Sequence, residues 1–191
     1  MRITCALTSG KLTTPAADLI VFPEGVCWKE IQAAQSSYSK SVIVGAVIEN
    51  GQSREVLLHQ GLNRIDYLKV QTDGQTTGNG DPKQDPVYYL ENLCIGVLIC
   101  MDIDAVEFSG AVIKKIRSSR ANLKLLCIPA DMASCWDILA FPKRFEGIHV
   151  ILCNHTKTYQ GSARCQSFIA DAHGRKIVVQ VQDEPIYAGL A

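Results

Sequence analysis

The chain carries no excess of charge of either sign. Its 191 residues include 19 Lys and Arg against 19 Asp and Glu, so the formal net charge is zero. A general binder of nucleic acid or of a membrane surface depends on a basic excess, so neutrality argues against both partners. Neutrality also weakens the repulsion between copies of the chain, which favours self-association.

Long hydrophobic runs are also missing. No apolar stretch approaches the roughly 18–20 residues that a helix needs to cross a bilayer, so a membrane-spanning protein is not expected. The hydrophobic and charged fractions, 47% and 20%, are those of a folded domain and exclude a disordered chain. We find no internal repeat, low-complexity tract or linker. We therefore expect one domain that covers residues 1–191.

The eight cysteines are not spaced in pairs. No C-x-x-C motif occurs, so a zinc ribbon and a thioredoxin-type redox motif lack support. Most of the cysteines lie in apolar runs, where a free thiol acts as a small buried hydrophobe. The first residues do not resemble a signal peptide, so we expect a cytoplasmic protein with reduced thiols. A redox-responsive protein is the weakest alternative, and one defined disulfide formed under mild peroxide would support it.

Short apolar runs rich in Val, Ile and Leu recur along the chain and predict strands, because each is bounded by Gly, Pro, Asn, Asp or Ser. Helical spacing predicts helices over 27–38 and 109–116 and a third around 136–147, which Pro142 would break or kink. Many strands and few helices indicate a layered sandwich of mixed sheets. The predicted strands include 3–7, 19–22, 42–48, 56–58, 94–100, 125–128, 150–153, 167–169 and 177–181.

Two polar stretches interrupt this pattern. Residues 71–86 are rich in Gly and Pro and predict a loop of the length usually reserved for function or mobility. The basic residues of 114–124 are not interleaved with aromatic side chains, as a binder of single-stranded nucleic acid requires. We interpret them as the solvated face of an amphipathic helix.

Glu24 follows four apolar residues and a proline and precedes a glycine. Pro23 ends the strand ladder and Gly25 permits a sharp turn, so Glu24 is held at the carboxyl end of a strand. Apolar surroundings raise the pKa of a carboxyl group towards the range of a general base. Taken alone, the pattern also fits an ordinary glutamate in a turn.

Lys69 and Cys100 hold comparable positions at the ends of apolar segments. A buried ammonium at position 69 suits the stabilisation of an oxyanion or of an ionised carboxylate. Cys100 ends the most apolar run, and acidic residues and a helix follow it. The amide dipoles of the helix start are expected to favour its thiolate, and the N–H of Met101 to point at a developing oxyanion. Taken alone, the pattern around Lys69 also fits an exposed lysine at a strand end, and the pattern around Cys100 also fits a cysteine of the core.

Taken together, these segments resemble the nitrilase, or carbon–nitrogen hydrolase, superfamily. The resemblance covers nearly the whole chain and keeps the order glutamate, lysine, cysteine. Residues 19–24, 67–69 and 95–102 with Glu107 resemble its glutamate, lysine and cysteine motifs, and 143–154 and 167–174 resemble two further segments of the family.

The resemblance implies an α-β-β-α layered sandwich with two mixed β-sheets, assembled as a homodimer through an outer layer. It implies hydrolysis of a non-peptide C–N bond in a small-molecule amide, carbamoyl compound or nitrile, without a metal or an organic cofactor. Glu24 would then be the general base, Cys100 the nucleophile, and Lys69 the stabiliser of the tetrahedral intermediate.

Three more positions are expected to bind the oxyanion or the substrate. They are Met101, Asp102 and Asp131, the first through its backbone N–H.

The chain also departs from the family pattern. It is short, and 10–17 is a brief connection where the family has a helix. Many members carry a second active-site glutamate in the loop between the lysine and the cysteine, whereas 71–86 contains none. Asp73, Asp81 and Asp85 are the carboxylates of this loop, and Glu91 follows it. The alternative is therefore a catalytically impaired pseudo-enzyme that uses the sandwich for binding or assembly.

Overall fold

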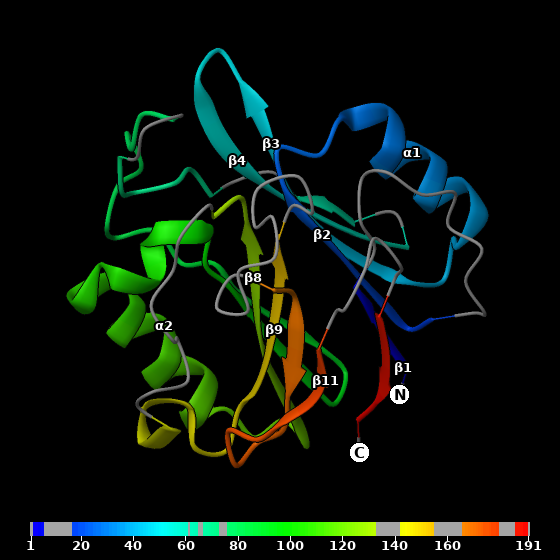
Figure 1. The fold of residues 1–191 in the computed structure, drawn as a ribbon, viewed down its shortest axis with the longest axis vertical. Helices are drawn as coiled ribbons and strands as arrows, with labels where there is room; N and C mark the ends of the chain where they lie inside the picture. The colour runs from blue at the N-terminus through cyan, green and yellow to red at the C-terminus, as the bar shows by residue number, and fades with distance from the viewer. Residues whose placement is uncertain are drawn as a thin grey trace.

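Two six-stranded sheets pack face to face at the centre of the molecule (Figure 1). The computed structural model describes residues 2–5, 17–60, 62–64, 67–72, 76–132, 142–154, 166–179 and 186–190. Each sheet contains three neighbouring parallel strands flanked by antiparallel ones, so both sheets are mixed. This arrangement confirms the expected pair of mixed sheets.

The first sheet has the strand order β12-β1-β2-β3-β4-β5, with β1, β2 and β3 parallel. Its strands are β1 (Arg2–Cys5), β2 (Leu19–Glu24), β3 (Val42–Glu49), β4 (Gln52–His59), β5 (Leu62–Arg64) and β12 (Ile186–Gly189).

The second sheet has the order β11-β10-β9-β8-β7-β6, with β7, β8 and β9 parallel. Its strands are β6 (Val87–Leu90), β7 (Leu93–Val97), β8 (Leu123–Ala130), β9 (His149–Asn154), β10 (Phe168–Ala170) and β11 (Lys176–Val179).

Each sheet is covered on its outer face by a helix, α1 (Trp28–Ser37) on the first and α2 (Val106–Ser118) on the second (Figure 1). α1 buries Ile31 and Ala34, one turn apart, against the first sheet. α2 comes close to β7 because Gly96 lacks a Cβ, which would otherwise meet the Ile116 side chain. With the apolar layer between the sheets, the α-β-β-α sandwich is confirmed.

The predicted elements agree with the structure in most places. The apolar runs lie in strands, and both amphipathic segments are helices. The described part of 71–86 contains neither helix nor strand. β5, β6 and β12 were not predicted, because each has only three or four residues and lies at or near a sheet edge, where a long apolar run is not required.

Several predicted segments lie partly outside the described residues. They are the strands 3–7 and 177–181, the loop 71–86, the N-terminal connection 10–17 and the third helix around 136–147. Within the last of these, Pro142–Phe145 forms the short 3-10 helix η3. Among the described helices, none combines the length and the apolar character that crossing a bilayer requires.

Candidate active site

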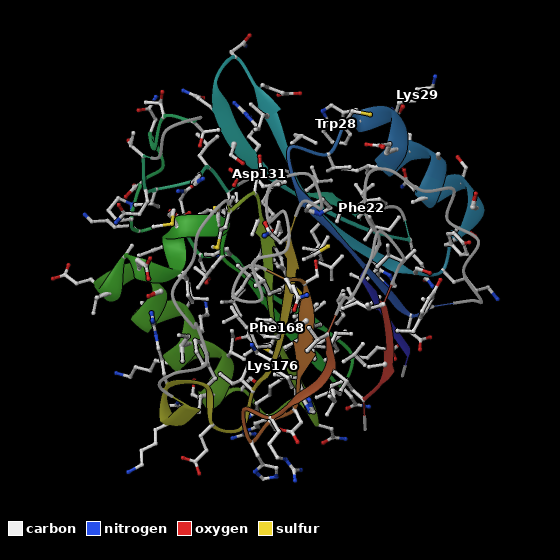
Figure 2. All side chains as sticks on the ribbon, in the orientation of Figure 1. Phe22, Trp28, Lys29, Asp131, Phe168 and Lys176 are labelled. Atoms are coloured by element: carbon white, nitrogen blue, oxygen red, sulfur yellow. The ribbon has the colours of Figure 1, made fainter. Side chains whose placement is uncertain are left out.

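Residues predicted to be catalytic meet at one end of the two sheets, where parallel strands finish. Glu24 is the last residue of β2, and Cys100 follows β7 after two buried residues. Figure 2 shows Asp131 at the end of β8, the strand that pairs with β7. The carboxyl ends of parallel strands are the usual place for a binding site in an open sheet.

Lys69 and Glu24 form a buried ion pair. The Lys69 Nζ donates to Glu24 Oε1 at 2.9 Å and to Oε2 at 3.2 Å. Only 1% of Lys69 and 2% of Glu24 is exposed. Charges this deeply buried are tolerated when they are paired and hydrogen-bonded, as these are. The pair therefore places one cation and one anion at a fixed separation inside the protein.

Cys100 completes this cluster. Its thiol lies within hydrogen-bonding reach of the Glu24 carboxylate, and the backbone N–H of Asp131 donates to its sulfur. Cys100 is 2% exposed. The structure therefore brings Glu24, Lys69 and Cys100 into one contact group, although 76 positions separate the first from the last.

The backbone of Cys100 is left-handed, with φ at 49°. A residue with a Cβ adopts this conformation at a cost of roughly 1–2 kcal/mol. Cys100 opens the 3-10 helix η1 (Cys100–Asp104), which leads into α2. The predicted strand 94–100 therefore ends early, at Val97, and the unusual backbone conformation turns the chain so that the thiol faces Glu24.

Cys100 is protonated at neutral pH. Burial and, after it, the charge of Glu24 raise the pKa of its thiol to about 12, although Lys69 and the Asp131 N–H oppose the rise. The expected preference for the thiolate is therefore wrong. The effect of a short 3-10 turn cannot compensate for burial beside a carboxylate.

Glu24 is the group that can take the proton from Cys100. Burial raises the pKa of its carboxyl group, and the charge and hydrogen bonds of Lys69 oppose that rise. Lys69 therefore favours the ionised form of the carboxylate that faces the thiol. A thiol beside a carboxylate held in this way is the arrangement of a nucleophile with its general base.

Lys69 is carried by an extended segment that runs beside β4. The N–H of Glu55 donates to the Tyr67 carbonyl at 2.9 Å, and the N–H of Lys69 donates to the Ser53 carbonyl at 3.0 Å. Tyr67 and Lys69 are buried, whereas Leu68 between them is partly exposed. This alternation is the strand period of two, and it turns the ammonium inwards.

Asp102 connects the Cys100 turn to the Lys69 segment. Its carboxylate accepts hydrogen bonds from the N–H of Val70 at 3.0 Å, from the N–H of Gln71 at 2.6 Å and from the Tyr67 hydroxyl. Asp102 is completely buried, and burial raises the pKa of its carboxyl group to about 6 although these donors lower it. The sequence suggests a role in oxyanion or substrate binding, but these contacts indicate a residue that holds the two segments together.

Met101 and Asp131 both lie beside Cys100. Asp131 reaches the Cys100 sulfur with its backbone N–H. Met101 lies in η1 next to Cys100, and its contribution to an oxyanion site stays a prediction.

Glu55 is a buried acid beside this site that the sequence did not reveal. It is 0% exposed, and the Tyr88 hydroxyl donates to its Oε2 at 2.7 Å, which links β4 of the first sheet to β6 of the second. It shares an inward face with Leu57, two residues further along β4. The polar residues 53–55 give no strand signal, so the predicted strand covers only 56–58 and leaves Glu55 out.

The three described carboxylates in the loop 71–86 or just after it have another partner or an exposed position, so none of them is marked as a replacement for the missing loop glutamate. Asp81 accepts the N–H of Lys83 at 2.8 Å, and Asp85 pairs with Lys115 at the surface. Glu91 is exposed in the β6–β7 turn, at the opposite end of β7 from Cys100. Asp73 lies outside the described residues. Among the residues described, no three His, Cys, Asp or Glu side chains are grouped to hold a metal ion.

Comparisons with known proteins identify similar folds but no similar sequences. No protein-family profile matches the chain, and no curated protein does. The NitN amidase from Nesterenkonia sp. AN1 superposes with a TM-score of 0.72 at 17% identity, over 100% of this chain and 93% of the amidase. Nit3 from Saccharomyces cerevisiae, a member of branch 10 of the nitrilase superfamily, gives a TM-score of 0.68 at 14% identity, over 98% and 89%.

A further structure of the Nesterenkonia amidase contains a covalent adduct at its active-site cysteine. A variant of the amidase with Gln in place of a Glu carries the product of Michael addition of acrylamide at its active-site cysteine. It superposes with a TM-score of 0.73 at 16% identity, over 100% of this chain and 93% of the amidase. At these identities the likeness concerns the fold, and it confirms the fold expected from the sequence motifs.

Proposed function

We propose that this chain, which has the fold of nitrilase-superfamily amidases, is a thiol hydrolase that cleaves the C–N bond of a small amide. The observation that carries the proposal is the buried contact of Glu24, Lys69 and Cys100, which come from three distant segments. Carbamoyl compounds and nitriles are the other substrates that this chemistry accommodates.

The first step forms a covalent bond to the substrate. The Cys100 thiol gives its proton to Glu24 while the sulfur attacks the carbonyl carbon, and the carbonyl π electrons move to oxygen. The ammonium of Lys69 has three donors and can therefore contact both Glu24 and the oxyanion. The N–H of Met101 is the second proposed donor to the oxyanion. Preorganised donors of this kind stabilise the charge that develops in the transition state.

The second step releases the amine. The tetrahedral intermediate collapses, the C–N bond breaks, and the leaving nitrogen takes the proton that Glu24 holds. A thioester on Cys100 and a Glu24 carboxylate remain. Water then attacks the thioester as Glu24 takes a proton from it, the C–S bond breaks, and the proton returns to sulfur. The products are a carboxylic acid and the enzyme in its starting state.

Proton transfer through Glu24 explains why a thiol with a pKa of about 12 can serve as the nucleophile. The sulfur does not have to ionise before the substrate arrives, because the base lies in contact with it. Lys69 has two roles. It opposes protonation of Glu24 in the resting site, and it stabilises the oxyanion in the transition state.

The test is a panel of small amides, carbamoyl compounds and nitriles, read by ammonia release and by intact mass. We expect ammonia from at least one amide and an acyl adduct on Cys100. Cys100→Ala should abolish both, whereas Cys94→Ala, which alters another buried cysteine, should retain both. Absence of ammonia with every compound, together with a Cys100 no more reactive towards iodoacetamide than Cys94 or Cys153, would contradict the proposal.

The alternative is a pseudo-enzyme that uses the sandwich for binding or assembly. The surroundings of Asp81, Asp85 and Glu91 favour it, because each of these carboxylates has another partner or an exposed position and none is marked as a replacement for the missing loop glutamate. It predicts neither ammonia nor an acyl adduct. An acyl adduct on Cys100 would exclude it.

Assembly and location are further proposals. We expect one domain, a homodimer and a cytoplasmic protein that binds neither nucleic acid nor membranes. A monomer mass by light scattering at high protein concentration would contradict the dimer.

A further inference from the structure

The segment that carries Lys69 has two backbone edges, and only one of them faces β4. On the β4 side, Tyr67 and Lys69 use their carbonyl and N–H groups in strand-like pairing with Glu55 and Ser53. The backbone groups of Leu68 point the other way, as the alternation of a strand requires. A second neighbour is therefore needed to pair with Leu68.

The side chain of Gln84 is that second neighbour. Its Oε1 accepts the N–H of Leu68 at 2.8 Å, and its Nε2 donates to the Leu68 carbonyl at 3.0 Å. This is the pair of bonds that a residue of an adjacent antiparallel strand makes to its partner. One side-chain amide thus substitutes for a strand that the loop 76–86 does not form.

The loop holds the Gln84 amide in place. The carbonyl of Asp81 accepts both the backbone N–H of Gln84 at 3.0 Å and its Nε2 at 2.8 Å. Gly80 donates its N–H to the Lys69 carbonyl at 2.9 Å, and a Cβ on Gly80 would meet the Leu68 carbonyl oxygen. The loop therefore hydrogen-bonds to the backbone of Leu68 through Gln84 and to the carbonyl of Lys69 through Gly80.

We infer that Gln84 is a positioning residue for Lys69, because its amide pairs with both backbone groups of Leu68 and so fixes the segment that projects the ammonium onto Glu24. This inference rests on the proposed catalytic function of Lys69. The hydrogen bonds of the Gln84 side chain run to Leu68 and Asp81, so it acts through the backbone next to Lys69.

Removal of the Gln84 amide leaves both backbone groups of Leu68 without this partner. The ammonium must reach both oxygens of Glu24, at 2.9 and 3.2 Å, so a small displacement weakens the pair. A misplacement of about 1 Å in a catalytic group can lower the rate on the order of 10²-fold. We therefore expect a lower kcat with little change in KM, because Gln84 makes no proposed contact with substrate.

The pH dependence distinguishes this role from a general loss of stability. Lys69 lowers the pKa of the Glu24 carboxyl group. A displaced ammonium lowers it less, so the acid limb of kcat/KM shifts to higher pH. A variant that only reduces the folded fraction lowers the whole profile without shifting it.

The test compares wild type with Gln84→Ala and with a matched control, Gln32→Ala, on the exposed surface of α1. On an amide that the wild type hydrolyses, Gln84→Ala should lower kcat about tenfold or more and shift the acid limb upwards. Gln32→Ala should match the wild type. Equal profiles for Gln84→Ala and wild type, or a uniform loss in proportion to the unfolded fraction, would overturn the inference.

A second variant and a second readout cover the other outcomes. If Gln84→Ala does not fold, Gln84→Met keeps the length of the side chain without its amide and without a new charge, and the same shifted or unshifted acid limb decides. The rate of acrylamide addition to Cys100 against pH, followed by intact mass, reports the Glu24–Lys69 pair without turnover. A shifted labelling profile in a protein that hydrolyses nothing would support the positioning role while the proposed function fails. Active wild type with unshifted variants would reject the positioning role alone.

Discussion

The ammonium of Lys69 lies 2.9 Å from one oxygen of the Glu24 carboxylate and 3.2 Å from the other, in a site from which water is largely excluded. Neither charge has enough exposed surface to be solvated by bulk water. Each therefore depends on the other, and this dependence gives the proposed base its ionised form and the proposed oxyanion donor its position.

Lys69→Met should destabilise the protein by about 3–5 kcal/mol, because it leaves the Glu24 charge buried without its partner. The double variant Glu24→Gln with Lys69→Met removes both charges and should recover most of that loss. Urea unfolding measures both free energies. Lys114→Ala, at an exposed position of α2, is the control and should change stability by less than about 0.5 kcal/mol. A double variant no more stable than Lys69→Met would contradict the interpretation.

Glu24→Gln should abolish proton transfer from Cys100 while it keeps the shape of the side chain. Loss of a general base typically lowers the rate about 10²–10⁴-fold, so we expect a fall of this size in kcat/KM. The measurement is ammonia release from the amide identified in the panel. Activity within about threefold of wild type would show that another group takes the proton.

Asp102 should make stability depend on pH. Its pKa of about 6 in the folded protein lies above the ordinary 3.8, so the folded state binds the proton more tightly than the unfolded state does. The free energy of unfolding should therefore fall as the pH rises from about 4 to about 6, by up to about 3 kcal/mol from this group.

The variant Asp102→Asn isolates this effect, because it removes the titrating group. The difference in unfolding free energy between wild type and Asp102→Asn should shrink or reverse in sign over that interval, to the disadvantage of the wild type at the higher pH. Parallel pH profiles would contradict the raised pKa of Asp102. Glu24 shifts stability in the same direction but is present in both proteins.

The left-handed backbone of Cys100 should be visible in stability. Glycine adopts a φ near 49° without steric cost, so Cys100→Gly should be more stable than Cys100→Ala, by up to about 1 kcal/mol. Cys94 in β7 is the matched control, because glycine weakens a regular strand by about 0.5–1 kcal/mol relative to alanine. The two positions should therefore give differences of opposite sign in urea unfolding. Equal signs would argue against strain at Cys100.

Much of the fold was predictable because burial in a sandwich imposes a local signal. Strands such as β3 and β8 are buried over most of their length, so their residues read as apolar runs. The short strand β6 is buried over only part of its length, so its residues do not form a long apolar run. The glutamate, lysine and cysteine motifs also predicted which residues, Glu24, Lys69 and Cys100, the fold brings together.

The rest of the site depends on contacts that no local pattern encodes. Gln84 pairs with Leu68, sixteen positions earlier in the sequence, and Glu55 accepts a hydrogen bond from the Tyr88 hydroxyl across the space between the two sheets. The prediction of a thiolate at Cys100 was wrong because it, too, depended on a contact between distant residues. The sequence displays the helix that follows the cysteine, but not the carboxylate that the other sheet places against it.

The proposed base and the proposed nucleophile belong to different layers of the sandwich, Glu24 to the first sheet and Cys100 to the second. The proposed base and nucleophile therefore meet only while the two sheets are packed in the correct register, even if each sheet on its own stays folded. Catalytic competence should accordingly be lost on warming before far-UV circular dichroism changes, since a slip between intact layers separates sulfur from carboxylate without melting a single strand.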